Sequence, residues 1–246
     1  MKTAQNLTLI AGLLAVSGSA SADFTHGPDP YAAGYGFDTP TEAAWGGWNR
    51  GDAGTLYAEW DTFLDSSYPG TRTAAPDVGS AGSADAHIGW NPGTFMAGSG
   101  NLYSYSVAEK FKVSLSGPTN NEPLRAALQF ETSGRQMDYN SLSLNGVSPT
   151  FTAQTYYDGG YATSFGPVEL VQYLAYWDLS APASNYLFSF NGPVHLSLAQ
   201  VAIDIGPNTG SSTGPISAVP LPAAVWLFGA GFMGLLGLNR KKGLAA

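Results

Sequence analysis

Alternation of apolar and polar side chains with a period of two is the main pattern in the middle of this chain. Residues 111–115 alternate cleanly, and Ala126, Leu128 and Phe130 share one face of the next apolar run. A strand that is buried on one face shows this pattern, because successive side chains point to opposite faces of a sheet. Residues 23–205 contain no sustained period of 3.6, so we expect strands throughout.

Gly-containing pairs between the apolar runs predict turns. Asn145-Gly146 and Asn191-Gly192 each follow an apolar run, and Asp158-Gly159 lies within a group of tyrosines. Such pairs are typical of tight hairpins, because the central residues of a type I′ turn need positive φ. We therefore expect a turn at each of the three pairs.

The apolar positions of residues 194–205 change parity. They are even up to Leu198 and odd from Val201 onward. Because the side-chain period of a strand is two, the register must slip between these positions. The sequence therefore predicts a β-bulge or a bend near Ala199 and Gln200.

Residues 168–179 differ from the other runs because both of their faces are apolar. Such a strand is either central and covered on both sides, or it presents aromatic side chains to a ligand. Residues 25–51 are too rich in Gly, Pro and Ala to predict strands, and we expect them to wrap around the domain. Together the patterns predict an all-β fold, a jelly-roll-like two-sheet sandwich of about eight to ten short strands.

Composition agrees with this fold class. The chain has 246 residues, 31 of them Gly, and it is 13% aromatic but only 11% charged, against about 25% charged for an average domain. Cysteine is absent, which excludes a thiol nucleophile, Cys-ligated zinc and haem attached through C-x-x-C-H.

The two ends of the chain are built differently from the middle. Lys2, the apolar residues 7–16 and the A-x-A site at Ala20 and Ala22 follow one another in the order of a secretory signal peptide. We therefore expect signal peptidase to remove residues 1–22 and the domain to be exported across the inner membrane.

Charge separates the same parts of the chain. All 18 acidic residues but only six of the ten basic residues lie between residues 23 and 218, so the exported part carries a net charge of −12. A domain this acidic is repelled by nucleic acid, and we expect no nucleic-acid partner.

An uncharged stretch follows the domain. Residues 206–218 form a Gly/Ser/Thr/Pro linker after the exported domain, residues 23–205. Residues 219–238 contain no charged side chain, and as a helix they would span about 30 Å, the thickness of a bilayer core. The basic cluster Arg240, Lys241 and Lys242 comes next and favours a cytoplasmic end, with the domain on the far side.

The tail, residues 219–246, resembles the PEP-CTERM sorting signal of bacterial envelope proteins. The resemblance rests on the motif Val219, Pro220, Leu221 and Pro222, on the apolar stretch after it and on the basic cluster. The usual motif is V-P-E-P, and Leu221 stands where the Glu would be. The resemblance implies a transiently anchored protein, cut by an exosortase-type membrane transpeptidase and released to the cell surface or the extracellular polysaccharide matrix. The alternative is a plain single-span anchor.

Two short motifs match enzyme patterns without the context that those patterns need. Residues 229–234 read G-x-G-x-x-G, but only twelve residues follow and none is acidic, so no dinucleotide cofactor is expected. Residues 210–214 read G-x-S-x-G, but they lie in the linker rather than at a strand-to-helix turn.

Residues that bear catalytic chemistry form no recognisable constellation. Glu109 and Glu131 are candidate carboxylates for glycoside hydrolysis by residue type, as are Glu59, Asp61 and Glu169, but alternation predicts that Glu109 and Glu131 are outward and solvated. The three histidines lack metal-ligand spacing, and His195 has the parity of a surface residue. Calcium candidates are Asp77, Asp85 and Asp204, without an EF-hand or RTX spacing. We predict no enzyme, metal or cofactor.

Carbohydrate binding is the remaining hypothesis for the domain. Sugar rings stack on aromatic faces, and the sequence supplies five tryptophans in the domain and Tyr156, Tyr157 and Tyr161. Tyr173 and Trp177 are the predicted stacking pair. The sequence thus predicts a structural or glycan-binding protein of the envelope matrix; a secreted hydrolase of matrix polysaccharide and a passive surface protein are the alternatives.

Overall fold

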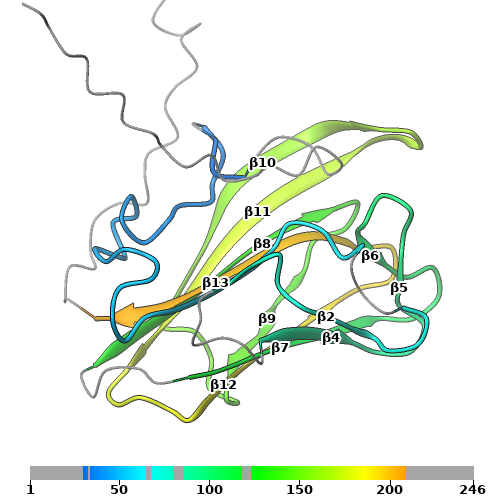
Figure 1. Ribbon diagram of the computed structural model, residues 1–246. Helices are drawn as coiled ribbons and strands as arrows, with labels where there is room; N and C mark the ends of the chain where they lie inside the picture. The colour runs from blue at the N-terminus through cyan, green and yellow to red at the C-terminus, as the bar shows by residue number, and fades with distance from the viewer. Residues whose placement is uncertain (1–29, 33, 65–67, 80–85, 118–122, 209–246) are drawn as a thin grey trace, which may run out of the picture.

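The computed structural model is an all-β protein of two antiparallel sheets (Figure 1). It describes residues 30–32, 34–64, 68–79, 86–117 and 123–208. Within these ranges there are thirteen strands and no helix, and thus no helix long and apolar enough to cross a membrane. Four strands are only two residues long, too short to show alternation. This is why the sequence pattern predicted about eight to ten strands rather than thirteen. The predicted signal peptide and sorting signal lie outside the described residues.

The large sheet holds eight strands. They are β1 (Leu56–Trp60), β3 (Val78–Gly79), β5 (Phe95–Met96), β6 (Leu102–Tyr103), β8 (Leu124–Ser133), β10 (Phe151–Thr163), β11 (Gly166–Leu179) and β13 (Ser197–Pro207). The order across the sheet is β10-β11-β8-β13-β1-β3, and β6 pairs with the start of β13 and with β5.

The small sheet holds five strands. They are β2 (Thr73–Ala74), β4 (His87–Trp90), β7 (Glu109–Ser116), β12 (Asn185–Gly192) and β9 (Asp138–Leu144), in this order across the sheet. Successive long strands alternate between the sheets: β8 of the large sheet comes between β7 and β9 of the small one, and β12 comes between β11 and β13.

Three of the connections that cross between the sheets lie together at one end of the sandwich, which we call the crossing end. They are residues 104–108, 134–137 and 193–196. Ser197, which opens β13, pairs with Ser133, which closes β8, so the connections beside them lie together. The crossing end carries β5 and β6 and lies at the right in Figure 1.

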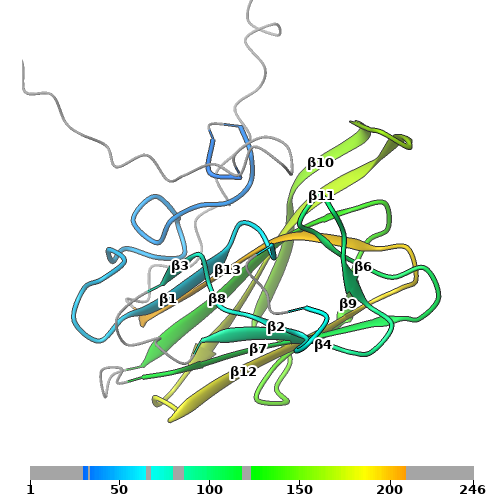
Figure 2. The ribbon, with the colours of Figure 1, turned by 45° about the vertical axis from the view of Figure 1, so that its right-hand side comes forward.

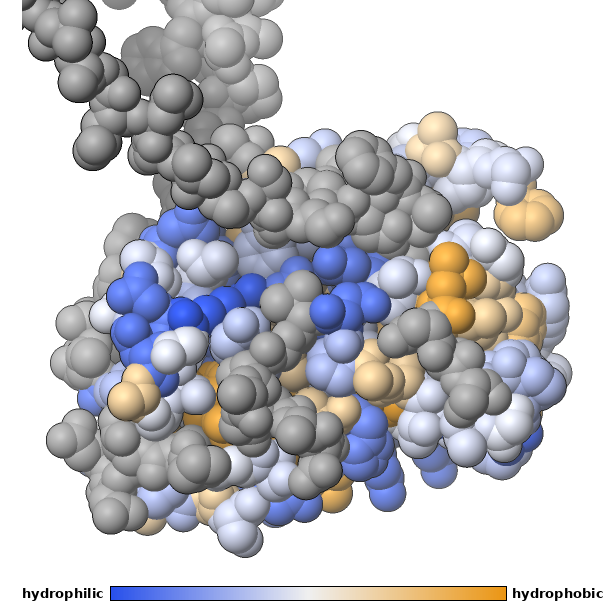
Figure 3. All heavy atoms as spheres, in the orientation of Figure 1, coloured by the Kyte–Doolittle hydropathy of each residue, from blue (hydrophilic) through white to orange (hydrophobic). Residues whose placement is uncertain are grey.

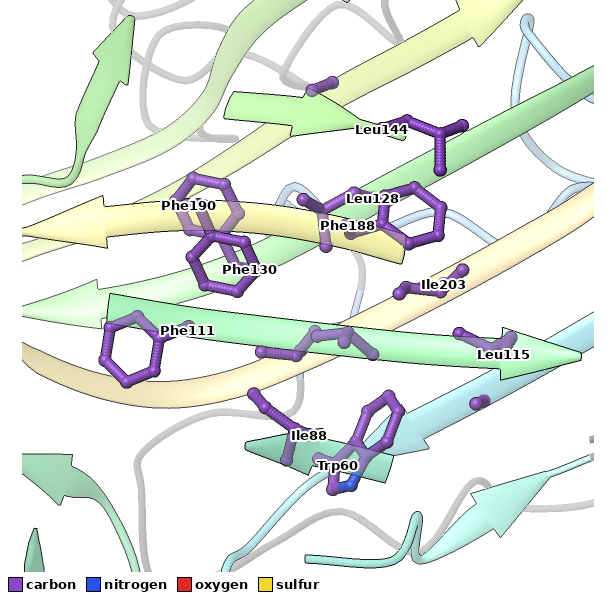
Figure 4. Packing of buried hydrophobic residues seen from close by; sticks show 14 of the residues in the cluster. Trp60, Ile88, Phe111, Leu115, Leu128, Phe130, Leu144, Phe188, Phe190 and Ile203 are labelled. Carbon is purple, nitrogen blue, oxygen red and sulfur yellow. The ribbon is translucent and has the colours of Figure 1, made fainter. Parts of the chain in front are cut away.

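The facing sides of the two sheets form the core. Phe130 of β8 stacks on Phe190 of β12 with ring centroids 5.7 Å apart, and Phe111 of β7 lies 5.4 Å from Phe190 (Figure 4). Burial of each such ring contributes roughly 1.5–3 kcal/mol. The alternation of Ala126, Leu128 and Phe130 is confirmed, since all three belong to this core.

β11 is covered on both faces, as the first reading of its two apolar faces predicted. Tyr173 and Trp177 point into the core between the sheets. Leu174 and Tyr176, on the opposite face, belong to a second and smaller cluster with Ala43, Trp45, Trp48 and Ala127. The large sheet is therefore the middle layer of three.

Residues 30–32 and 34–54 form the third layer, which we call the covering layer. They run without a strand over the outer face of the large sheet (Figures 1 and 2), which confirms the expected wrapping for this part of residues 25–51. Side-chain amides of the sheet hold their backbone. Gln129 Oε1 accepts from the Asp38 N–H and Gln129 Nε2 donates to the Asp38 carbonyl, both at 2.9 Å, and Gln172 Oε1 accepts from the Gly36 N–H at 2.6 Å.

Arg50 attaches the covering layer to β13 and β1. It donates from Nε and Nη2 to the two carboxylate oxygens of Asp204, at 2.6 and 2.8 Å, and from Nη1 to Glu59 Oε2 at 2.7 Å. Tyr31 closes the network, because its hydroxyl donates to Glu59 and accepts from Arg50, each at 3.0 Å. Asp204 is 1% exposed. These acidic neighbours raise the pKa of Arg50, against the opposing effect of burial.

The predicted change of parity at residues 194–205 is confirmed as a β-bulge. The register of β13 against β8 shifts between Leu198 and Gln200. The Asn145-Gly146 turn is also confirmed, since these residues have φ of 50° and 81° and Leu144 bridges to Val147 across them.

The two other predicted turns are wrong. Asn191-Gly192 forms the last two residues of β12, and the chain turns only after it, between Pro193 and Leu196; Asp158-Gly159 lies inside β10. Asp158 Oδ1 accepts from the Gly160 N–H at 2.8 Å, and β10 bulges between Asp158 and Tyr161, so the strand continues through the glycines. The chain instead turns after Thr163, the residue that pairs with Gly166 at the start of β11.

Replacing Arg50 tests the attachment of the covering layer. Arg50→Ala leaves the buried Asp204 carboxylate without its ion pair, and we expect the free energy of unfolding to fall by about 3–5 kcal/mol. Denaturant titration followed by tryptophan fluorescence measures the loss. Arg72→Ala is the control, since Arg72 is exposed and its change should stay within about 0.5 kcal/mol. Equal stability of the two variants would contradict the role of Arg50.

Candidate functional site

The structure places the predicted stacking pair, Tyr173 and Trp177, in the core. Trp177 is 1% exposed, its Nε1 donates to the carbonyl of Val147 at 2.8 Å, and its ring meets Phe188 edge-on. Tyr173 is 7% exposed and stacks on Tyr139 with ring centroids 4.0 Å apart. Stacking with a sugar needs an open ring face, and neither Tyr173 nor Trp177 presents one.

The remaining tryptophans of the domain are buried as well, and each is at most 7% exposed: Trp45, Trp48, Trp60 and Trp90. Among the described residues, the aromatic side chains with large exposure are Tyr105, Tyr157 and Phe165. Only Tyr157 belongs to the tyrosine group that the sequence singled out. In the described part of the chain, an open aromatic surface for a ligand must therefore include at least one of these three residues.

The expectation that Glu109 and Glu131 are outward and solvated is wrong, since both are 0% exposed. Glu109 shares the core-facing side of β7 with Phe111 and Val113. Glu131 lies on the outer face of the large sheet, and Gln172, which also holds the covering layer, donates to its Oε2 at 2.7 Å. Alternation marks which residues share a face, and it does not show that a third layer covers that face.

The other candidate acids have structural partners. Glu59 and Asp204 bind Arg50. Asp77 accepts from the N–H groups of Asp61 and Thr62 at 2.7 and 2.9 Å, and Asp85 lies outside the described residues. In the part of the chain that the structure describes, no group of three His, Asp or Glu side chains could hold a metal ion.

Phe95, Tyr103, Tyr105 and His195 gather at the crossing end, and we call them the aromatic cluster. Phe95 and Tyr103 are directly opposite in the β5–β6 ladder, with ring centroids 5.8 Å apart. Tyr105 stacks on Phe95 at 5.2 Å and meets Tyr103 edge-on at 4.8 Å. Tyr105 is 65% exposed. Figure 3 shows hydrophobic side chains gathered over β5 and β6 on this side of the molecule.

His195 completes the cluster from a strained backbone position. Its φ is 69°, a left-handed conformation that costs a non-glycine residue about 1–3 kcal/mol. It is the third residue of a turn closed by the Leu196 N–H on the Pro193 carbonyl at 3.3 Å. Its own N–H donates to the Ser104 carbonyl at 3.0 Å, and its Nδ1 and the Tyr103 hydroxyl are 2.9 Å apart. Its predicted exposure is confirmed.

Glu109 lies at the same end, at the first position of β7, paired with Gly192. Neither of its carboxyl oxygens has a hydrogen-bond partner among the described residues. Burial raises the pKa of Glu109 to about 9, so the carboxyl is neutral at physiological pH. Burial, Tyr105 and Glu109 together raise the pKa of Tyr103.

The aromatic cluster can bind a ligand by stacking and by hydrogen bonds. Tyr105 offers an open ring, and Tyr103 and His195 offer a phenol and an imidazole whose orientation their mutual hydrogen bond fixes. No protein-family model, no curated protein and no solved structure matches this chain. A function must therefore be inferred from the chemistry of its own residues.

Sequence patterns did not indicate this cluster. Phe95 and Tyr103 meet only because β5 and β6 pair, and two-residue strands show no alternation. His195 reads as an ordinary surface histidine, and nothing local predicts its positive φ. The one available signal was the aromatic repeat Tyr103-Ser-Tyr105, which is too short to distinguish a surface from a core.

The buried Glu109 predicts a dependence of stability on pH. Its carboxyl titrates near pH 4.5 when unfolded and at about 9 when folded. Between these values only the folded state holds the proton, so stability falls as pH rises, by at most about 1.4 kcal/mol per pH unit. Chemical denaturation from about pH 5 to about pH 9 measures this slope. The free energy of unfolding of Glu109→Gln should depend less on pH than that of the wild type. Parallel curves of the two would show that Glu109 is ionised in the folded protein.

Proposed function

We propose that this chain is an exported glycan-binding protein of the bacterial envelope or exopolysaccharide matrix. The observation that carries the proposal is the aromatic cluster, with Tyr105 held on Phe95 and Tyr103 and still 65% exposed. Contiguous groups of exposed apolar side chains, unlike single ones, mark sites of interaction. The neighbouring phenol and imidazole suit a ligand that carries many hydroxyl groups.

The strained backbone of His195 supports the aromatic cluster as the binding site. A left-handed histidine costs stability, and such positions cluster at ligand-binding sites because the surrounding structure holds them. Here the hydrogen bond to Tyr103 and the one to the Ser104 carbonyl hold it. Glycine or asparagine would occupy the same turn position at lower cost, so the imidazole itself is useful to the protein.

The ends of the chain support the location. We infer that residues 1–22 direct export and that residues 219–246 hold the protein in the membrane until an exosortase-type transpeptidase cuts at the Val219–Pro222 motif. The released domain would then lie at the cell surface or in the matrix, where polysaccharide is the abundant ligand. The acidic domain, with a net charge of −12, makes nucleic acid an unsuitable partner.

We also propose that the sandwich is of the jelly-roll type. Its large sheet has the order β1-β13-β8-β11 and faces β7-β12-β9, and consecutive strands alternate between the two sheets. This interleaving is expected of two Greek keys closed into a double sheet. β10 departs from a simple alternation, because it forms a hairpin with β11 in the same sheet.

The aromatic cluster is tested by replacing Tyr105. Native gels that contain a neutral β-glucan or an acidic polyuronate, run with and without calcium, should retard the full chain kept in a neutral detergent. Tyr105→Ala should weaken binding at least about tenfold, because stacking on an exposed ring is lost, and tenfold corresponds to about 1.4 kcal/mol. Phe165→Ala is the matched control, since Phe165 is 97% exposed and lies outside the cluster.

Three outcomes would contradict this proposal. Equal retardation of Tyr105→Ala and wild type would exclude the cluster as the site. Release of new reducing ends from the polysaccharide by the pure protein would show a hydrolase instead of a binding protein. Absence of both retardation and cleavage would leave a passive matrix component.

The sorting motif is tested in a bacterial host that carries an exosortase. Replacement of Val219, Pro220, Leu221 and Pro222 by alanine should keep the chain in the membrane fraction, because the transpeptidase no longer recognises it. Immunoblots of membrane and medium, with the intact mass of the released form, measure the effect. Leu221→Glu, which restores the usual motif, is the control and should be released at least as well as the wild type. Unchanged release of the alanine variant would exclude this signal.

A further inference from the structure

A half-buried carboxylate, that of Glu169, lies in a network of side chains on the β10–β11 hairpin and on the chain beside it. The Tyr157 hydroxyl donates to Glu169 Oε1 at 3.3 Å, and Gln136 Nε2 donates to Glu169 Oε2 at 3.1 Å. The Tyr139 hydroxyl donates to Gln136 Oε1 at 3.5 Å, and its ring stacks on Tyr173 of the core. We call Tyr139, Gln136, Glu169 and Tyr157 the hairpin cluster. It runs from the core to the surface, where Tyr157 is 48% exposed.

The carboxylate of Glu169 can accept further hydrogen bonds. It has two donors, Tyr157 and Gln136, and it forms no ion pair with any of the described residues. An ionised carboxylate offers about four lone-pair sites. The charge of Glu169 is the main cause that raises the pKa of Tyr157, so the phenol keeps its proton and continues to orient the carboxylate. A ligand rich in hydroxyl groups would supply additional donors.

A glycine in β10 makes room for the ring of Tyr157. A Cβ at Gly159 would be 2.9 Å from the Tyr157 hydroxyl oxygen and 3.2 Å from its Cε1, which is too close for a side chain to fit without displacing the ring. The ring therefore folds back over the backbone of its own strand. The pair Asp158-Gly159, which the sequence pattern interpreted as a turn, instead leaves space for an exposed tyrosine.

The hairpin cluster and the aromatic cluster lie on opposite faces of the large sheet. One row of directly paired residues crosses the sheet through Tyr103, Ser197, Ser133, Leu170 and Asp158. Directly paired residues lie on the same face, and their neighbours in the chain point to the other face. Tyr157 precedes Asp158 and Glu169 precedes Leu170, so both lie on the face opposite to Tyr103. The sheet separates the two clusters, and one short glycan cannot contact both.

We propose that the hairpin cluster is a second and independent glycan-binding site, and that one copy of this protein joins two chains of a neutral polysaccharide. This inference rests on the glycan-binding function proposed above and adds cross-linking of the matrix to it. Tyr157 supplies a half-open ring for stacking, and Glu169 supplies a charged acceptor, which binds hydroxyl groups more strongly than a neutral one. The row from Tyr103 to Asp158 spans four strand spacings, or about 19 Å at roughly 4.8 Å each.

Charge favours a neutral polysaccharide over an acidic one. The exported part of the chain carries a net charge of −12, and the carboxylate of Glu169 would lie directly beside a bound uronate. Because the two sites face apart, a short ligand gains no added affinity from the second site. The expected result is therefore bridging between polymer chains rather than tighter binding of a single short one.

Stoichiometry with a short ligand tests the second site. The probe is the trisaccharide of the neutral β-glucan used in the native gels, titrated calorimetrically into the full chain in neutral detergent. We expect two trisaccharides per chain for the wild type and one each for Tyr157→Ala and Tyr105→Ala, because each substitution should weaken its own site at least about tenfold. Phe165→Ala, at the exposed tip of the same hairpin, is the control and should still bind two.

Sedimentation of the long β-glucan tests the bridging. The wild type should pellet the polymer at low speed, because each copy joins two chains. Tyr157→Ala and Tyr105→Ala should each bind the polymer and leave it in solution. Pelleting by these variants as strong as that by the wild type would show that several copies in one detergent micelle join the chains, and it would overturn the inference.

The outcomes separate this inference from the function on which it rests. One trisaccharide per wild-type chain, with binding lost in Tyr105→Ala and unchanged in Tyr157→Ala, would overturn the second site and leave glycan binding in place. Binding of the acidic polyuronate alone would do the same. Failure of the wild type to bind either polysaccharide would overturn both. Thermal unfolding of every variant identifies a loss that comes from misfolding, and in that case Glu169→Gln, which keeps the shape and removes the charge, replaces Tyr157→Ala.

Discussion

The bidentate pair between Arg50 and Asp204 is the contact on which the three-layer structure depends. The outer face of the large sheet carries charged and amide side chains that would need water if nothing lay over them. Arg50 forms ion pairs with Asp204 and Glu59 at once, and this allows the covering layer to lie over that face. Breaking one partner of a buried pair costs several kcal/mol, because the other charge stays behind. The pair therefore specifies where the covering layer lies more than it adds net stability.

Covering the outer face has a consequence for function. One face of the large sheet packs on the small sheet, and much of the other packs under the covering layer. Aromatic residues of both faces are therefore buried. Trp48 and Trp177 illustrate the two sides, one in each hydrophobic cluster. Aromatic rings remain open where the chain leaves the sheets, at the crossing end and on the β10–β11 hairpin. The residues that the sequence suggested for stacking are thus buried, whereas the open ring of Tyr105 comes just after the two-residue strand β6 and that of Tyr157 lies between the two bulges of β10.

Sequence patterns predict the features of the fold that depend on neighbouring residues in the chain. The bulge near Ala199 follows from parity alone, because a strand cannot keep both runs on one face. The Asn145-Gly146 turn follows from its φ requirements. The covering layer does not follow, because Gln129 and Asp38 are 91 positions apart and an amide that replaces a ladder partner has no sequence signature. The exposure of Glu109 was misjudged because an alternating strand was expected to hold its carboxylates outward, although Glu109 has the same parity as the core residue Phe111.

Two costly features of the fold lie where the function is proposed. His195 holds a left-handed backbone without being glycine, and Glu109 is a buried carboxyl with no hydrogen-bond partner among the described residues. Each reduces stability, and a sequence selected only for stability would replace both. Elsewhere in the described residues the core alternates and the Asn-Gly turn has its usual φ, although further buried polar atoms without a hydrogen-bond partner there, such as Trp45 Nε1 and Arg125 Nη2, lie away from the crossing end. Because departures from local consistency in natural proteins concentrate at functional sites, the position of His195 and Glu109 beside Tyr103 is an argument for the crossing end that is independent of the exposed rings.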